Sequence, residues 1–233
     1  FLSVLDEGEE VLLTDSCYEP TRNVARDTLK RFGITARFYD PRIGARIAEL
    51  ITPQTKAIFV ESPGSLTFEV QDLPAIVAAA EPRGITVIVD NSWATPLFHK
   101  PLAFGADIVV HAGTKMFVGH SDAMFGTISA NERAWPKVAR THRLLGMTAS
   151  PDDSYLAARG MRTLAIRMKE HETRALDLAG WLEHQETVLE VIHPAIASHP
   201  DHEIWKRDFT GAGSIFAVML EPAPREAVAA SDL

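Results

Sequence analysis

The stretch Gly84-Ile-Thr-Val-Ile-Val-Asp90 predicts a short buried strand, because it is continuously apolar and β-branched, and it ends in a carboxylate. A second run of the same plan, Ala106-Asp-Ile-Val-Val-His111, is followed by Ala-Gly-Thr-Lys115. Ligands of open parallel α/β sheets bind in the crevice beyond the carboxyl ends of the strands. We therefore expect Asp90 and Lys115 to face one site from neighbouring strands.

The pairing of a lysine with a carboxylate has a chemical meaning. A lysine amine has an ordinary pKa of about 10.4, so it must be desolvated or placed near positive charge to act as a nucleophile at neutral pH. Pyridoxal phosphate suits such a pair, because a lysine holds its aldehyde as a Schiff base while an acidic partner keeps the pyridine nitrogen protonated. The alternatives at this point are a solvated lysine and an aspartate that caps a helix or forms a turn.

Strand-like runs alternate with helical patterns in the first 150 residues, and this order predicts a mostly parallel sheet flanked by helices. The expected strands cover residues 11–13, 35–39, 56–60, 84–90, 106–111 and 123–129, and the expected helices cover residues 21–32, 43–51, 73–80 and 132–145. We expect residues 1–150 to form one large domain.

Residues 151–233 are expected to form a connecting helix and the start of a smaller C-terminal α+β domain. Asp152 or Asp153 is a candidate cap for the helix that follows it, and residues 164–184 predict a longer helix with a mixed charged face. Strands are expected at residues 188–192 and 214–220.

Composition limits the classes of function. The chain has 233 residues, of which 46% are hydrophobic, so it can bury a substantial core. Its net charge of -8 argues against nucleic acid or an anionic membrane as the main partner. No apolar run approaches the ~20 residues that span a bilayer, and the first residues lack a basic signal-peptide head, so a cytoplasmic location is expected. Cys17 is the single cysteine, which excludes an internal disulfide.

Other kinds of site find no support in the spacing of the residues. His193, His199 and His202 match no helical pair of zinc ligands, so we expect no metal site. No Gly-x-Gly-x-x-Gly follows the first strand, as a dinucleotide site would require. Ser121 and Asp122 directly follow His120 in the sequence. A hydrolase triad is recognised by the geometry of its three side chains, so adjacency in sequence does not indicate one.

Three segments resemble successive signatures of the Cys/Met-metabolism pyridoxal-phosphate enzymes: Glu61-Ser-Pro-Gly-Ser-Leu-Thr-Phe-Glu-Val70, Val89-Asp-Asn-Ser-Trp-Ala-Thr-Pro96 and Gly113-Thr-Lys-Met-Phe-Val-Gly-His-Ser-Asp122. The resemblance runs from the first residues to about Leu220. It implies an aspartate-aminotransferase-like fold of type I. Trp93, residues 121–127 and residues 205–211 look most like the branch of the family that cleaves L-cystathionine by β-elimination.

The resemblance also implies roles for individual residues. Lys115 would hold pyridoxal 5'-phosphate and abstract the Cα proton of the substrate, and Asp90 would keep the pyridine nitrogen protonated. Tyr18 would stack on the pyridine ring and help to move a proton, and the Thr114 hydroxyl would contact the phosphate. Many relatives carry Asn where Ser65 stands here, and this departure favours β-acting over γ-acting members.

The implied reaction releases homocysteine, pyruvate and ammonia from L-cystathionine, in methionine biosynthesis or transsulfuration, by an enzyme that is a dimer or tetramer of identical chains. Two alternatives stay open. One is a γ-eliminating or γ-replacing relative, which would give 2-oxobutyrate in place of pyruvate when it eliminates. The other is a non-catalytic fragment. Upstream of the matching sequence, relatives carry a phosphate-binding loop, a Tyr and an Arg, and downstream of it they carry an arginine that binds the substrate carboxylate.

Overall fold

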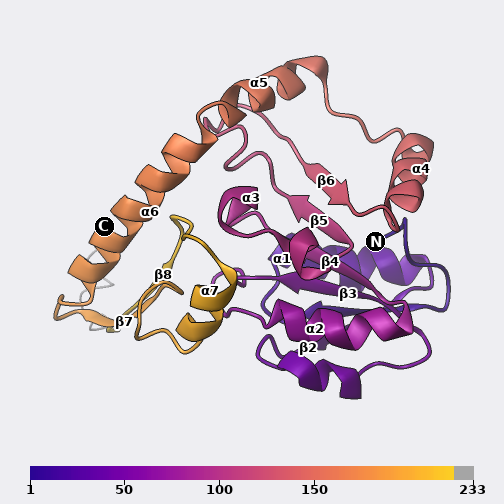
Figure 1. The fold of residues 1–233 in the computed structure, drawn as a ribbon, viewed down its shortest axis with the longest axis horizontal. Coiled ribbons are helices and arrows are strands. Elements are labelled where there is room, and N and C mark those ends of the chain that lie inside the picture. Colours follow the sequence, from indigo (N-terminus) through magenta and orange to yellow (C-terminus); the bar gives the residue numbers. More distant parts are fainter. Residues whose placement is uncertain (223–233) are drawn as a thin grey trace, which may run out of the picture.

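The structure is a computed structural model that describes residues 1–222, and its main feature is a six-stranded sheet with helices on both faces (Figure 1). The strands lie in the order β2-β1-β3-β4-β5-β6. The first five pair in parallel, and β6 is antiparallel to β5. The predicted fold class, a mostly parallel sheet flanked by helices, is confirmed.

Each strand of this sheet falls in or near an expected run. The strands are β1 (Glu10–Thr14), β2 (Thr35–Tyr39), β3 (Thr55–Glu61), β4 (Thr86–Asp90), β5 (Ile108–His111) and β6 (Thr127–Ala130). The strand expected at residues 123–129 begins later, at Thr127. Phe125 does not pair with β5, because its N–H donates a hydrogen bond to the Thr114 hydroxyl at 2.7 Å.

The helices around the sheet are shorter and more varied than the sequence pattern predicts. They are α1 (Glu19–Asn23), the π-helical η1 (Val24–Leu29), the 3-10 turns η2 (Gly44–Glu49), η3 (Glu81–Arg83) and η4 (Pro101–Phe104), α2 (Leu73–Ala80), α3 (Thr95–Phe98) and α4 (Trp135–Leu145). The bounds expected for α2 are confirmed, because Asp72 caps it by accepting the Ala75 N–H at 3.2 Å. The helix expected from residue 21 begins at Glu19, with Pro20 in its first turn.

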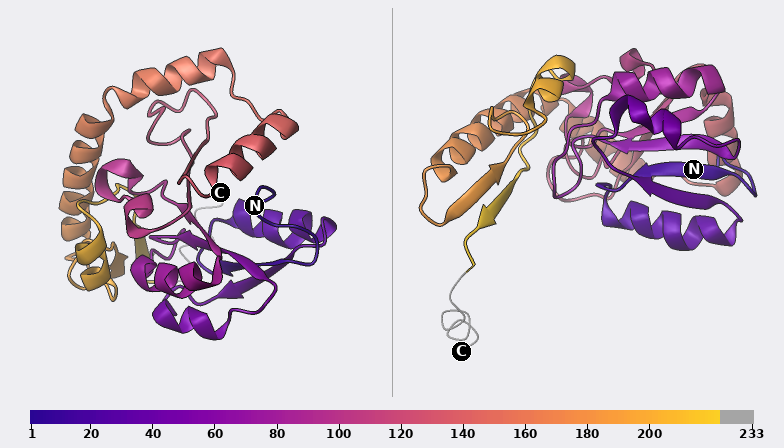
Figure 2. Two further views of the ribbon diagram at one scale, coloured as in Figure 1. Left: turned by 45° about the vertical axis from the view of Figure 1, so that its right-hand side comes forward. Right: turned by 90° about the horizontal axis from the view of Figure 1, so that it is seen from below.

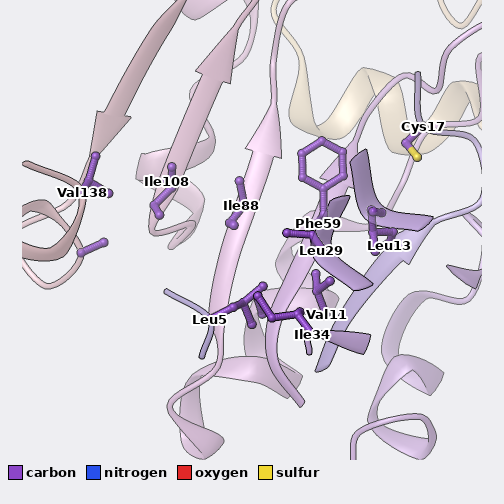
Figure 3. Close-up of a cluster of buried hydrophobic side chains, with 13 residues drawn as sticks. Leu5, Val11, Leu13, Cys17, Leu29, Ile34, Phe59, Ile88, Ile108 and Val138 are labelled. Carbon is purple, nitrogen blue, oxygen red and sulfur yellow. The ribbon is translucent and has the colours of Figure 1, made fainter. Parts of the chain in front are cut away.

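The core lies on both faces of the central strands, which are almost wholly buried. Alternate residues of β1 and β3 enter two clusters, as a strand's period of two requires. Leu13 and Phe59 pack on the face covered by η1 and α4 (Figure 3). Leu12 and Ile58 pack on the opposite face against α2 and η2. Full burial of one such side chain stabilises the fold by about 1.5–3 kcal/mol.

Two long helices lead away from the sheet towards a second, smaller sheet. They are α5 (Pro151–Met161) and α6 (Leu164–Leu182), and the strands β7 (Val188–Ile192) and β8 (Ala217–Leu220) pair antiparallel beside α6 (Figure 2). The proposed cap at Asp152 or Asp153 is wrong. The Ser150 hydroxyl caps α5 by accepting the Asp153 N–H at 2.9 Å, which leaves both aspartates in the first turn.

The segment between β7 and β8 returns to the large sheet and contains the short helix α7 (His202–Asp208). Arg42 pairs with buried Asp201 at 2.8 Å, and Asp201 also accepts the Val70 N–H at 3.0 Å. Arg207 pairs with Asp72 at 2.8 Å. These contacts cross the division between residues 150 and 151, which stays a prediction. Within residues 1–222, no helix is both long and apolar enough to cross a membrane.

A buried carboxylate joins β4, β5 and the turn after β6. Asp107 is 3% exposed and accepts the Val87 N–H at 2.9 Å and an Asn131 amide N–H at 2.8 Å. Arg133 also donates to it, at 2.6 Å. The cluster lies where β4 and β5 begin, at the edge of the sheet opposite to Asp90.

We therefore expect Asp107→Ala to lower the free energy of unfolding by about 3 kcal/mol, because it leaves a buried backbone N–H and a guanidinium without their acceptor. Urea unfolding measures this change. The matched control is Glu49→Ala, which removes an exposed carboxylate 3.5 Å from Arg46 and should change stability by less than about 1 kcal/mol. Equal effects of the two substitutions would contradict the structural role of Asp107.

Candidate active site

The carboxyl ends of β1, β3, β4 and β5 bring four chemically active side chains to one edge of the sheet. Parallel pairing sets Glu61, the last residue of β3, directly opposite Asp90, the last residue of β4. Tyr18 follows β1, and Lys115 lies in the loop after β5. The edge expected to carry Asp90 and Lys115 therefore also carries Tyr18 and a second carboxylate.

Lys115 and Tyr18 lie against each other. The Lys115 Nζ is 5.3 Å from the centroid of the Tyr18 ring, over its face. The lysine is exposed, and Tyr18 is 50% exposed. Within the described residues the Lys115 amine has neither a hydrogen-bond acceptor nor an ion-pair partner. The amine is therefore accessible to a ligand that approaches the Tyr18 ring.

The loop that carries Lys115 is held by its own backbone and by the α5–α6 junction. The Lys115 N–H donates to Ala112 O at 2.9 Å, and the Gly119 N–H donates to Lys115 O at 2.8 Å. Arg167, from α6, donates to Met116 O at 2.9 Å. The position of the lysine thus depends on a helix that lies far along the chain.

Packing against Gly160 adds to this support. A Cβ at Gly160 would lie 2.2 Å from Phe117 O and 2.3 Å from Val118 O, so α5 meets the backbone of the lysine loop directly. The Phe117 side chain itself packs with Leu164 and Met168. Only glycine allows so close an approach between a helix and another backbone.

Asp90 is linked to the lysine loop through Ser92. The Ser92 N–H donates to Asp90 Oδ1 at 2.9 Å, and the Ser92 hydroxyl accepts the Ala112 N–H at 2.7 Å. Burial lowers the pKa of nearby His111, and the charge of Asp90 opposes that effect. Among the described residues Asp90 makes no direct contact with Lys115, although both act electrostatically on Glu61.

Glu61 is half-buried between these groups. Its Oε2 accepts the Tyr18 N–H at 2.9 Å. Burial and the neighbouring charge of Asp90 raise the pKa of the Glu61 carboxyl from 4.5 to about 7. The sequence pattern assigns no role to Glu61, although Glu61 ends its strand in the same way as Asp90.

Thr114, the predicted phosphate contact, uses its hydroxyl within the protein. The hydroxyl donates to Phe125 O at 3.1 Å and accepts the Phe125 N–H at 2.7 Å. A phosphate would need the hydroxyl proton to turn away from Phe125. The role of Thr114 in binding phosphate stays a prediction.

A cavity of about 800 Å³ opens beside Lys115, within the size range of small-molecule sites. It is lined by residues of the lysine loop and the turn after it, by Asp153, Arg167 and His171 from α5 and α6, and by Ser214 and Ile215. Tyr18, Asp90 and Glu61 do not line it. Trp93 contacts one of the lining residues: its indole N–H donates to Ile215 O at 2.7 Å. No periodic signal marks Arg167 or Ser214 in the sequence.

Residues 1–222 contain no group of three or more His, Cys, Asp or Glu side chains arranged to hold a metal ion. His193 and His199 are buried, and each accepts a backbone N–H through Nδ1: His193 from Ala195 and His199 from Asp201, both at 3.1 Å. The buried histidines therefore have a structural explanation in packing.

Comparison with known proteins places this geometry in a family. The model of the family described as Cys/Met metabolism PLP-dependent enzymes matches residues 1–232. A protein of Rhizobium johnstonii named putative cystathionine beta-lyase is 46% identical over 220 residues, which cover 94% of this chain and 56% of that protein. Cystathionine beta-lyase MetC of Escherichia coli is 42% identical over 223 residues, which cover 94% of this chain and 56% of that enzyme.

A solved structure agrees with the relatives. The crystal structure of cystathionine gamma-lyase from Lactobacillus plantarum, complexed with L-serine, superposes with a TM-score of 0.91 at 32% identity, and the match covers 94% of this chain and 57% of that one. The chain thus spans a little over half the length of the relatives that it matches.

The glycine at position 160 offers a test of the support for Lys115. We expect Gly160→Ala to displace the lysine loop, since the added Cβ would overlap two backbone carbonyls, and to lower the free energy of unfolding by about 2 kcal/mol or more. Thermal unfolding and proteolysis of the loop measure both effects.

Gly180→Ala is the matched control, because Gly180 also lies in a helix and a Cβ there meets nothing within 4 Å. It should leave the loop unchanged and stabilise the protein by up to about 1 kcal/mol through helix propensity. If both substitutions were equally mild, the contact between α5 and the lysine loop would be wrong.

Proposed function

Because the chain belongs to the Cys/Met metabolism PLP-dependent enzymes, we propose that it acts in a carbon–sulfur β-lyase that cleaves L-cystathionine. The balanced reaction takes up one water and releases homocysteine, pyruvate and ammonia. The observation that carries the proposal is the Lys115 amine over the Tyr18 ring, which has no polar partner among residues 1–222 and lies at the sheet edge where Asp90 ends the neighbouring strand.

The residues at this edge fit pyridoxal 5'-phosphate, the cofactor of the family. The aldehyde needs an accessible amine, the pyridine nitrogen needs an acid, and the ring needs a flat surface to stack on. Lys115, Asp90 and Tyr18 supply these three features, and the cavity of about 800 Å³ beside Lys115 gives room for an amino-acid substrate.

When bound, PLP withdraws electrons from the Cα of an amino acid and thereby makes the Cα proton acidic. Lys115 would hold the cofactor through its Nζ, and the same Nζ would take the Cα proton of the substrate. General base catalysis of this kind contributes about 10²–10⁴-fold to a rate. Asp90, whose Oδ1 accepts the Ser92 N–H, would hold a proton at the pyridine nitrogen.

Release of the thiolate needs a proton on the leaving sulfur. Lys115 would carry one after it has taken the Cα proton, and the Tyr18 ring lies beside that amine, with 5.3 Å between Nζ and the ring centroid. Tyr18 would stack on the cofactor ring and help to pass the proton to sulfur. Ring stacking and proton transfer suit a rigid side chain with a hydroxyl at its end.

The relatives named cystathionine beta-lyase are 46% and 42% identical to the chain, above the 34% of a cystathionine gamma-lyase of Bacillus subtilis, and this supports β-elimination. Ser65, where many relatives carry asparagine, favours the same reaction. γ-Elimination is the second candidate, because the Lactobacillus plantarum gamma-lyase shares the fold at a TM-score of 0.91. The same lysine and aspartate serve both reactions, so the keto acid that is released separates them.

The proposal extends to the setting of the enzyme. We propose a homo-oligomer, a dimer or a tetramer, that works in the cytoplasm on a free amino acid. Residues 1–150 form its cofactor-binding large domain, and residues 151–233 form the connecting helix and part of the small domain.

Absorption spectroscopy with added PLP tests the role of Lys115. The wild-type chain and the control Lys100→Ala, which changes an exposed lysine elsewhere, should both develop the visible band of lysine-bound PLP, and Lys115→Ala should lose it. Addition of L-cystathionine should then yield pyruvate only where the band forms.

The outcomes separate the candidate functions. 2-Oxobutyrate in place of pyruvate would favour γ-elimination. A band that persists in Lys115→Ala would contradict the assignment of the lysine, and the absence of any band in the wild-type chain would favour a non-catalytic fragment.

A further inference from the structure

The loops that follow β1 and β3 are joined beside the proposed reaction centre. The Ser65 N–H donates to Ser16 O at 2.7 Å, so the two backbones are tied together directly. Gly64 lies in the same contact, because a Cβ there would be 2.5 Å from the Ser16 side chain. Two residues further along the first loop, the Tyr18 N–H meets a side chain instead of a backbone, the Glu61 carboxylate, at 2.9 Å.

The Glu61 side chain thus connects the Tyr18 backbone to strand β3 of the sheet through a hydrogen bond. Tyr18 is the residue just before α1, and its own carbonyl accepts the Thr21 N–H at 2.9 Å. Its ring is half-exposed, so little packing holds it in place. The direction of the ring over Lys115 therefore depends on where its backbone is fixed.

Titratable groups face Glu61 from the neighbouring strands and loops. Asp90 lies opposite on β4, Lys115 reaches towards it from the loop after β5, and Cys17 and Tyr18 approach from the loop after β1. Burial and the charge of Asp90 oppose ionisation of Glu61, whereas the Tyr18 N–H, the Ser65 side chain and Lys115 favour it. The protonation of Glu61 is thus coupled to the same groups that the proposed reaction uses.

We propose that Glu61 is a positioning residue: its carboxyl group fixes the Tyr18 backbone so that the Tyr18 ring stays over the Lys115 amine, and its charge couples that contact to Asp90. The inference rests on the proposed function, in which Tyr18 and Lys115 handle the protons of the reaction. It adds a role for Glu61, which takes no direct part in the proposed reaction.

A purely structural role for Glu61 makes a different prediction. If Glu61 only ended β3, loss of its charge would change stability without any effect that depends on pH at Tyr18. Because Glu61 has a pKa of about 7, the hydrogen bond from Tyr18 should instead change in strength near neutral pH as the acceptor gains a proton.

Nuclear magnetic resonance of the chain without cofactor tests this coupling. The amide resonance of Tyr18 is followed from about pH 5 to about pH 9, and it should titrate with the pKa of Glu61. Glu61→Gln keeps an oxygen acceptor but cannot ionise, so the titration should disappear. Glu49→Gln, which removes an exposed acid elsewhere, should leave it in place. A flat wild-type profile, or one unchanged in Glu61→Gln, would overturn the proposal.

A second arm uses the chain with PLP. Glu61→Gln keeps the acceptor for the Tyr18 N–H, so its affinity for PLP should stay within about threefold of the wild type, while the dependence of the visible band on pH loses its component near 7. Glu61→Ala removes the acceptor and should weaken PLP binding by about tenfold. Equal affinities of the Gln and Ala variants would contradict the positioning role.

The two arms separate this inference from the proposed function. If the wild-type chain forms no band with PLP, the proposed function fails, and the amide titration still decides whether Glu61 controls the Tyr18 backbone. If the band forms and the titration is absent, only the role of Glu61 fails.

Discussion

The parallel pairing of β3, β4 and β5 is the constraint on which the site depends. Parallel strands end at the same edge, so three separate segments of the chain deliver Glu61, Asp90 and the Lys115 loop to one place. The two apolar clusters on either face of the sheet fix the register, because a shift of one residue would exchange buried and exposed positions. Core packing is therefore what sets the distances among the polar groups.

The same arrangement has a cost in stability. Two carboxylates end adjacent strands, and Glu61 has a pKa of about 7 where its ordinary value is 4.5. The folded protein thus binds more protons than the unfolded chain between these values, so stability falls as pH rises through this window and stays lower above it. The corresponding free energy is about 3 kcal/mol at most. A polar cluster this unfavourable for folding fits a site maintained for function.

Much of the sheet could be predicted from the sequence, and much of the support around the lysine could not. Strand-like runs identified β1 to β5, and the placing of the carboxylate at the end of β4 and of the lysine after β5 at one edge followed from the topology of parallel sheets. The resemblance to a family then added Tyr18, which the structure brings against Lys115. Glu61 carried the same strand-end signal as Asp90, and topology alone was enough to place it.

Contacts between distant segments have no comparable signal. Arg167 donates a hydrogen bond to the carbonyl of Met116, and Gly160 packs on the lysine loop, and nothing in the sequence of α5 or α6 indicates either contact. Local chemistry also overrode two expectations: Ser150 caps α5 ahead of Asp152, and Thr114 holds Phe125 out of β6. Such choices depend on which acceptor lies within reach after folding, and a single sequence does not state that.

The central claim is that Lys115 carries the cofactor, and chemical trapping tests it most directly. The chain would be mixed with PLP, reduced with borohydride, digested and analysed by mass spectrometry to locate the modified lysine. We expect a reduced phosphopyridoxyl group on Lys115. A label confined to other lysines, such as Lys100, or no specific label at all, would contradict it.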